Sequence, residues 1–316
     1  ILLWDADKVL NYVSVTLFSI LVIGGLLSSL GSAFTEIAVA NDLVPASIPS
    51  GELTSFNSRL RQVDLFTEVT SPILAGVLLV LSSPYFPHAG FLWVALWNAL
   101  SFIPEYLLLA SVLRQRPDLN TKMLIVPIPM KQSLSDKLFR GWKVFFKDPI
   151  WPVIACYALL WLSVLSPHGV LLTAYLKDGW QLPEWQIGLF RGGGALFGLA
   201  ATLLFPIAVK RVGLVNSSRA FILFQAACLI LGLFCFYGSG YPAQIGFLVA
   251  VLLSRIGLYG FSLGEMQVRQ IAITPERRGE MNGFANALTG LATLTLFGAG
   301  ALLPSTNDFH WLVAGS

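Results

Sequence analysis

The chain has 316 residues, of which 55% are hydrophobic and only 12% are charged. A soluble domain carries about 25% charged residues, so this composition, with a mean hydropathy of +0.72, excludes an ordinary soluble enzyme or nucleic-acid-binding protein. Apolar runs of about 20 residues recur, long enough to cross about 30 Å of hydrocarbon. The runs are continuous rather than alternating, which excludes a transmembrane β-barrel. The sequence predicts an all-α polytopic membrane protein.

The apolar runs predict eight full transmembrane helices and the beginning of a ninth. The eight spans are expected at 10–40, 60–82, 89–113, 149–176, 184–209, 218–238, 242–272 and 279–303. The ninth span begins near Phe309 and is cut at Ser316. Since the chain starts at Ile1 without a basic leader or signal-peptide pattern, we expect a piece of a longer protein that lacks material at both ends.

Positive charges alternate between successive connections. Lysine and arginine lie in or directly beside four connections, 42–59, 114–147, 210–217 and 273–278, with Arg59 and Arg61 at the first of them. The intervening connections contain a single lysine, Lys177. Because cytoplasmic loops of membrane proteins are enriched in these residues, the pattern predicts that the four basic connections lie in the cytoplasm.

The long basic connection divides the chain into two halves. Its amphipathic stretch, "SLSDKLFRGWKVFFKD", could form a surface helix on anionic lipid, but a linker between two bundles is the simpler interpretation. The segments that begin at Ser50 and Thr274 resemble each other, which predicts equivalent helices in the two halves. The sequence thus predicts a major facilitator superfamily fold, with a site between the lobes near the midplane. The expected units are 1–116 for the N-lobe, 117–148 for the cytoplasmic linker and 149–316 for the C-lobe.

Two acidic residues lie one helical turn apart in the stretch "RQVDLFTEV". Asp64 and Glu68 share one face of a helix, and a charge at mid-bilayer costs about 2.5–3.5 kcal/mol on insertion scales. Two acids that face a cavity would attract a cation. The alternative is that Asp64 pairs with Arg61 near the cytoplasmic end.

The stretch "WNALSFIPEYLLLA" places three oxygen-bearing residues, Asn98, Ser101 and Glu105, on one helix face. An amide oxygen, a hydroxyl and a carboxylate are hard donors that suit a divalent cation. The alternative is hydrogen bonding between helices by Asn98 and Ser101, with Glu105 close to a helix end.

The stretch "SVLSPHGVLLTAY" interrupts an apolar span with a proline, a histidine and a glycine. Pro167 removes a backbone donor and Gly169 loosens the helix, so we expect a break at 166–169. Broken helices bind ions in transporters through freed carbonyls, and a neutral imidazole suits transition metals. His168 is therefore a candidate metal ligand. The alternative is a proline kink with a hydrogen-bonded histidine.

Several of these stretches resemble the ferroportins, the iron exporters of the major facilitator superfamily. "NSRLRQVDLFTEV" is similar to the helix that enters their fifth span, "WNALSFIPEYLLL" to their sixth, and "SRIGLYGFSLGEMQVRQIAITPERRGEMNGFANAL" to their tenth and eleventh. The break at 166–169 falls where their seventh span unwinds. The resemblance covers nearly the whole chain and implies a bacterial relative in the inner membrane. It also implies that the first three spans are absent, leaving spans 4–6 in the N-lobe and spans 7–11 with the start of 12 in the C-lobe.

The resemblance implies two divalent-metal sites, one in each lobe. In the N-lobe, Asn98, Ser101 and Glu105 match site positions, at which family members also bind Ca²⁺ as an activator. In the C-lobe, His168 matches the unwound-helix position. Two further ligand positions on the eleventh span fall at Thr293 and Leu296. The C-lobe site is therefore expected to be poor in ligands.

The resemblance further implies a cytoplasmic gate. Asp42, Asn57 and Arg61 would face Arg278 across the lobes in the outward-open state, joined by charge-assisted hydrogen bonds. Breaking these bonds would let the lobes rock about the central site.

Together these observations predict a monomeric Fe²⁺ exporter that works by alternating access. One rival is a proton-coupled drug or organic-cation efflux transporter, in which Glu105 would supply the buried acid and Trp93 and Trp97 the aromatic wall. A rival of another class is a non-transporting membrane scaffold or receptor, which has no need of polar residues in mid-span. The sequence contains no Walker A or HExxH motif and no paired nucleophile and base, so an enzyme is not expected.

Overall fold

The computed structural model describes residues 2–82, 89–115, 141–303 and 305–316, and every regular element in these ranges is helical. The N-terminal half (2–115) contains α1 (Leu2–Glu36), the π-helix η1 (Ile37–Leu43), α2 (Val44–Ser47), α3 (Leu53–Ser82) and α4 (Ala89–Gln115). The C-terminal half (141–316) contains α7 (Trp151–Leu159), η2 (Leu160–Leu162), α8 (Val170–Asp178), α9 (Glu184–Val212), α10 (Leu214–Phe236), α11 (Tyr241–Ala272), η3 (Pro275–Arg277), α12 (Arg278–Leu302), η4 (Thr306–Asp308) and α13 (Phe309–Ala314). The predicted all-α class is confirmed. Most of the predicted linker, 117–148, lies outside the described residues.

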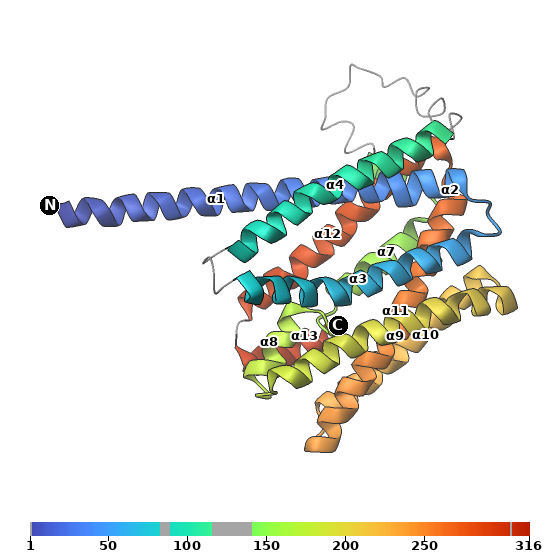
Figure 1. Ribbon diagram of the computed structural model, residues 1–316. Coiled ribbons are helices and arrows are strands. Elements are labelled where there is room, and N and C mark those ends of the chain that lie inside the picture. Colours follow the sequence, from blue (N-terminus) through green and yellow to red (C-terminus); the bar gives the residue numbers. More distant parts are fainter. Residues whose placement is uncertain (1, 83–88, 116–140, 304) are drawn as a thin grey trace.

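The long helices form a bundle in which the two halves touch (Figure 1). Helix α3 packs against α9, and η1 packs against α12, so both of these contacts join the N-terminal half to the C-terminal half. Helix α1 extends beyond the other helices at the N-terminus (Figure 1).

Six helices in the described part of the chain are long and apolar enough to cross a membrane. They are Val15–Ser47, Ala95–Gln115, Glu184–Val212, Leu214–Phe236, Tyr241–Ala272 and Pro275–Leu302. Each of the eight predicted spans corresponds to a helix or a broken helix, but two of them are not among these six. Helix α3 carries four charged residues between 59 and 68, and the span 149–176 is interrupted. The multi-pass membrane protein expected from the sequence is confirmed.

The predicted break in the span 149–176 is also confirmed. Helix α7 and η2 end at Leu162 and α8 begins at Val170, so residues 163–169, which we call the unwound segment, are not helical. Short backbone bonds hold it, from Ser166 N to Val164 O at 2.8 Å and from Gly169 N to Ser166 O at 2.9 Å. Pro167 has no N–H to continue a helix here.

The first predicted connection, 42–59, is shorter than expected. The helix continues through η1 and α2 to Ser47, and α3 begins at Leu53. Pro45 lies in the first turn of α2, where a missing N–H costs little. Thr54 and Asn57 look like loop residues in the sequence because they are polar, but their side chains bond to α11 instead of to water.

The contact between α10 and α11 depends on glycine. A Cβ built on Gly257 of α11 would lie 2.6 Å from the backbone oxygen of Phe221 and 2.6 Å from Gln225 Cβ, both on α10. Small residues allow the backbones of membrane helices to approach closely in this way.

We expect Gly257→Ala to destabilise the protein by about 1–3 kcal/mol, because the new methyl group meets backbone atoms that cannot move aside. This cost exceeds the gain of about 1 kcal/mol in helix propensity. Gly188→Ala on α9 is the matched control, since its Cβ would meet nothing within 4 Å. Thermal unfolding in detergent, followed by circular dichroism, compares them, and equal midpoints would contradict the packing argument.

Candidate metal site between the two halves

His168 lies in a cavity of about 330 Å³ that both halves of the chain line. Glu68 and Arg61 come from α3, whereas His168 and Ser166 come from the unwound segment. Helices α7, α11 and α12 complete the wall, with Tyr157, Arg255, Tyr259, Ser262 and Thr293 among its polar residues. The cavity is therefore polar, central and shared between the halves.

The unwound segment is fixed from the C-terminal half. The buried Arg255 of α11 donates a hydrogen bond from Nη2 to the carbonyl oxygen of Leu165 at 2.8 Å. The backbone N–H of Val164 donates to Ser316 Oγ at 2.9 Å. A charged donor makes a stronger hydrogen bond to a backbone carbonyl than a neutral donor does. Arg255 therefore stabilises the non-helical conformation of the unwound segment.

His168 presents Nδ1 to the cavity. Its Nε2 faces α9, where a Cβ on Gly194 would lie 3.2 Å from Nε2 and 2.9 Å from Pro167. Nε2 is buried without a described hydrogen-bond partner. Nδ1 lies 4.0 Å from Glu68 Oε1 on the opposite wall. A metal in the cavity would therefore be bound through Nδ1.

The two positions on α12 that the resemblance assigns to ligands line the same cavity as His168. Thr293 donates its hydroxyl proton to Thr289 O at 2.9 Å, which leaves the oxygen lone pairs as acceptors. Leu296 offers no donor atom. Across the described ranges, no three His, Cys, Asp or Glu side chains converge on a metal-sized point. Hydroxyls, carbonyls or water would have to complete a coordination shell here.

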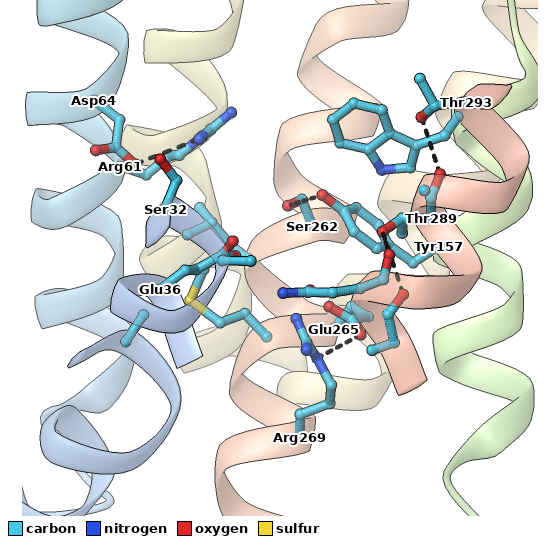
Figure 2. A pocket seen from close by; sticks show the side chains of 18 of the residues that line it. Ser32, Glu36, Arg61, Asp64, Tyr157, Ser262, Glu265, Arg269, Thr289 and Thr293 are labelled. Atoms are coloured by element: carbon cyan, nitrogen blue, oxygen red, sulfur yellow. Dashed lines mark hydrogen bonds and ion pairs between the residues drawn. The ribbon is translucent and has the colours of Figure 1, made fainter. Parts of the chain in front are cut away.

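A larger cavity of about 850 Å³ adjoins the first, and the two share Arg61, Tyr157, Trp161, Ser262 and Thr293. Figure 2 shows Ser32 and Glu36 of α1 on one side, opposite Glu265 and Arg269 of α11. The two cavities make a continuous polar space between the halves.

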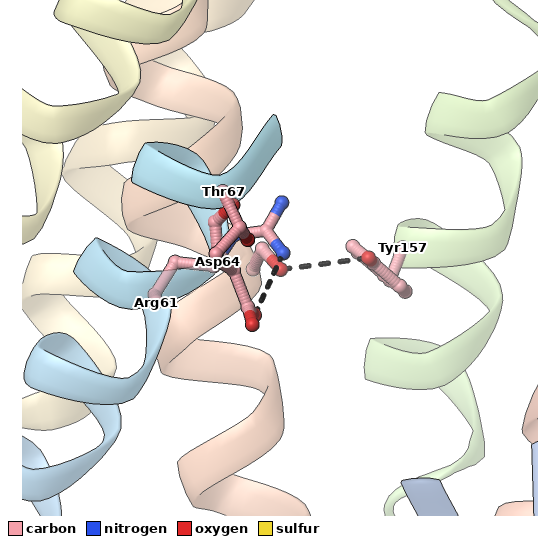
Figure 3. A network of polar contacts seen from close by, with 5 residues as sticks. Arg61, Asp64, Thr67 and Tyr157 are labelled. Atoms are coloured by element: carbon pink, nitrogen blue, oxygen red, sulfur yellow. Dashed lines mark hydrogen bonds and ion pairs between the residues drawn. The ribbon is translucent and has the colours of Figure 1, made fainter. Parts of the chain in front are cut away.

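The two acids of α3 lie in different cavities. Asp64 lines the larger one and pairs with Arg61 of the same helix, with 3.4 Å between Oδ2 and Nη1 (Figure 3). Tyr157 of α7 lies opposite this pair across the cavity (Figure 3). Glu68 lines the smaller cavity. Asp64 therefore adopts the pairing with Arg61 that the sequence left open as the alternative, and Glu68 alone faces His168.

A buried charge network on α11 was not predicted. Arg269 Nε lies 2.7 Å from Glu265 Oε1, and Arg269 Nη1 donates to Asn282 Oδ1 of α12 at 2.8 Å. Glu265 is 1% exposed and Arg269 is 6% exposed. The spacing of four between an acid and a base was the available signal, but it does not reveal burial.

Polar side chains join the halves at the end of the bundle that holds 48–52 and 273–277, which we call the basic end. Asn57 Nδ2 donates to Gln270 Oε1 at 2.7 Å, and Gln270 Nε2 donates to Ala40 O at 2.8 Å. Thr54 donates to Gln267 Oε1 at 2.9 Å. These bonds connect η1 and α3 to α11.

The predicted gate residues gather at this end but pair differently from the expectation. The described hydrogen bonds of Arg278 go to the carbonyl oxygens of Ile273 and Gln270, at 3.3 and 3.2 Å. Arg278 also attracts the half-buried Asp42 electrostatically. Arg61 instead stacks on Tyr259 of α11, 4.8 Å from the ring centroid. Gln270 thus stands between Asn57 and Arg278, and an amide side chain gives no charge pattern that would have revealed it.

We expect Gln270→Ala to shift the protein toward a form open at the basic end. The change removes two bonds between the halves, each worth about 0.5–1.5 kcal/mol net, or roughly a tenfold change in population per 1.4 kcal/mol. Spin labels at the exposed Gly51 and Gly279 should show a longer distance by pulsed electron paramagnetic resonance. Gln244→Ala, at the other end of α11, is the control. The same distance distribution in Gln270→Ala as in the wild-type protein would contradict the role of Gln270 in closing the basic end.

The stretch "GFSLG" at 260–264 fits the pattern of a serine-hydrolase nucleophile elbow. That motif requires a sharp turn between a strand and a helix, whereas these residues lie inside the continuous helix α11. Ser262 contacts Tyr157, with 3.5 Å between the two hydroxyl oxygens. The local structure is therefore not that of a nucleophile elbow.

The second set of predicted ligands lies on α4. Asn98, Ser101 and Glu105 share a face of this helix, but they line neither of the two central cavities. Asn98 and Glu105 are exposed, and Ser101 donates its hydroxyl proton to Asn98 O at 2.8 Å. A metal site on α4 stays a prediction.

Comparison with known proteins identifies the family. The family model described as Ferroportin1 (FPN1) matches residues 1–125 and 128–316. Ferreportin of Bdellovibrio bacteriovorus is 50% identical over 297 residues, which cover 94% of this chain and 66% of that protein. The chain therefore spans slightly less than two thirds of this relative.

Two solved structures distinguish the conformation. A bacterial homologue of the iron transporter ferroportin, in an outward-facing state with soaked iron, aligns with a TM-score of 0.79 at 48% identity, over 93% of this chain and 67% of the other. The same type of homologue in an inward-facing state, at 47% identity and the same coverage, aligns with a TM-score of only 0.61. The conformation described here is thus closer to the outward-facing one. The extent of the family match and the shared fold show that this chain belongs to the ferroportin family.

Proposed function

We propose that the protein exports a divalent metal, Fe²⁺, by alternating access between an N-lobe (1–116) and a C-lobe (149–316) joined by the linker 117–148. The observation that carries the proposal is the position of His168 Nδ1, held by an unwound helix in a polar cavity that both halves line. Binding at the interface of two bundles is typical of transporters of this type.

In this proposal the basic end faces the cytoplasm, as positive-inside predicts, and the bonds of Asn57, Gln267 and Gln270 close that side. Support comes from the greater similarity to an outward-facing homologue. Iron as cargo is supported by the soaked iron of that homologue. Ca²⁺ at Asn98, Ser101 and Glu105 would activate transport, and the protein would act as a monomer.

The test is metal flux into liposomes that contain the full-length protein, with a metal-quenched dye inside. Saturable Fe²⁺ or Co²⁺ uptake above that of empty liposomes is expected. Transport of an organic cation without metal flux would favour the drug-efflux alternative, for which aromatic residues such as Trp161 and Phe297 in the cavity wall are suited. Flux of neither would favour a scaffold or receptor.

A further inference from the structure

We propose that Glu68 is a second protein ligand of the metal that His168 binds, so that one ion bridges the two halves of the chain. The inference rests on the proposed metal transport. It adds a carboxylate from α3 to a site otherwise built from the C-terminal half, and it makes metal affinity depend on the conformation.

The geometry fits an ion between the two side chains. Glu68 Oε1 and His168 Nδ1 are 4.0 Å apart. Metal–nitrogen and metal–oxygen bonds of about 2.1 Å span about 3.4 Å at a tetrahedral angle and about 4.2 Å in line. An ion therefore enters this gap with little movement of either group. A carboxylate with an imidazole is a donor pair that first-row transition metals accept.

The charges of the cavity require Glu68. Arg61 and Arg255 also line it, and Glu68 is the only carboxylate among the described residues of its wall. Arg255 donates hydrogen bonds to Leu165 O and Ser254 Oγ. Arg61 pairs with Asp64 and stacks on the Tyr259 ring. Neither guanidinium therefore points at the space between Glu68 and His168. Without Glu68, the charged side chains among the described residues that line this cavity would be Arg61 and Arg255, and the interior dielectric screens their repulsion of a dication weakly.

Both ligands are accessible to an ion in the cavity. The side chain of Glu68 is 40% exposed and that of His168 is 21% exposed. The His168 Nε2 atom lies against α9 at Gly194, which leaves Nδ1 as the ring nitrogen that can bind a metal. The cavity of about 330 Å³ has room for several waters of about 30 Å³ each, which would complete the coordination shell beside Ser166 and Thr293.

The bridge has a consequence for transport. Helix α3 belongs to the N-terminal half and the unwound segment to the C-terminal half, so rocking of the halves would separate the two ligands. The ion would then be held by both side chains in the conformation described here and by one of them in the other. A difference in affinity between two states is what allows a ligand to shift their populations.

Co²⁺ binding to the full-length protein, measured by isothermal titration calorimetry, tests the bridge together with Co²⁺ flux. Glu68→Gln keeps the size of the side chain and should lower Co²⁺ affinity by at least about tenfold. Glu184→Gln, on the exposed pair with Lys177, is the matched control and should bind as wild type. The double variant Glu68→Gln with His168→Ala should lose less than the sum of the single losses, because both side chains bind one ion.

A shortened carboxylate separates ligation from charge alone. Glu68→Asp keeps the negative charge but withdraws its oxygens from the 4.0 Å gap by the length of one carbon–carbon bond. It should therefore bind Co²⁺ more weakly than wild type, nearly as weakly as Glu68→Gln.

The outcomes separate this inference from the proposed function. Wild-type Co²⁺ binding and flux in Glu68→Gln, with both lost in His168→Ala, would overturn the bridge and leave metal transport intact. Weak binding in Glu68→Gln with wild-type affinity in Glu68→Asp would also overturn it, because Glu68 would then act through its charge only. Absence of Co²⁺ binding and flux in wild type would overturn the proposed function itself.

Discussion

Replacing His168 with alanine is expected to reduce Co²⁺ or Fe²⁺ transport by at least about tenfold. His168 carries the only imidazole among the described residues that line the cavity between the halves, and its Nδ1 faces Glu68. Loss of even the outer partners of metal ligands typically costs 10–100-fold, that is, about 1.4–2.7 kcal/mol. Initial uptake rates in proteoliposomes at several metal concentrations would separate a loss of affinity from a loss of maximal rate.

His310→Ala is the matched control for this prediction. His310 lies in α13, bonds to Asn307 O at 2.6 Å and lines neither central cavity. Its variant should transport at the wild-type rate. Equal uptake by wild type, His310→Ala and His168→Ala would remove His168 from the metal path.

Replacing Arg269 with methionine is expected to destabilise the protein by about 3–5 kcal/mol. The change leaves the Glu265 carboxylate buried without its counter-ion, and removal of one partner from a buried pair usually costs this much. It also deprives Asn282 of its donor. Thermal unfolding in detergent, or urea titration of the detergent-solubilised protein, would measure the loss.

Two further variants test the cause of this effect. Adding Glu265→Met to Arg269→Met should recover most of the lost stability, because no unpaired charge then remains buried. Lys177→Met breaks the exposed pair with Glu184 and should cost less than about 1 kcal/mol. Equal losses of stability for Lys177→Met and Arg269→Met would show that burial does not determine how much the Glu265–Arg269 pair contributes.

The helices could be predicted because a membrane span needs about 20 apolar residues in a row, and this requirement is visible in a sequence. The break before α8 could be predicted because Pro167 and Gly169 act on the local backbone. The extension of the first helix to Ser47 and the early start of α3 could not. The first turns of α3 hold Thr54 and Asn57, whose side chains bond to residues of α11 more than 200 positions away, and no local pattern reveals such contacts.

The candidate site could be predicted only in part, because it also depends on contacts between residues far apart in the sequence. Composition and spacing identify His168 and Glu68 as polar residues in apolar surroundings, but nothing local to either one shows that they face each other across 4.0 Å. The roles of Gln267 and Gln270 were missed because amides are common at helix ends and carry no charge. Asp64 pairs with Arg61, which also stacks on Tyr259 of α11, and this contact between two helices cannot be seen in the local sequence.

The most direct test of the central claim is a structure of the full-length protein soaked with Co²⁺, with anomalous scattering recorded at the cobalt edge. The account predicts an anomalous peak about 2.1 Å from His168 Nδ1, in the cavity between α3 and the unwound segment. A transport-active protein whose cobalt peak lies elsewhere, with His168 Nδ1 free of metal, would contradict it.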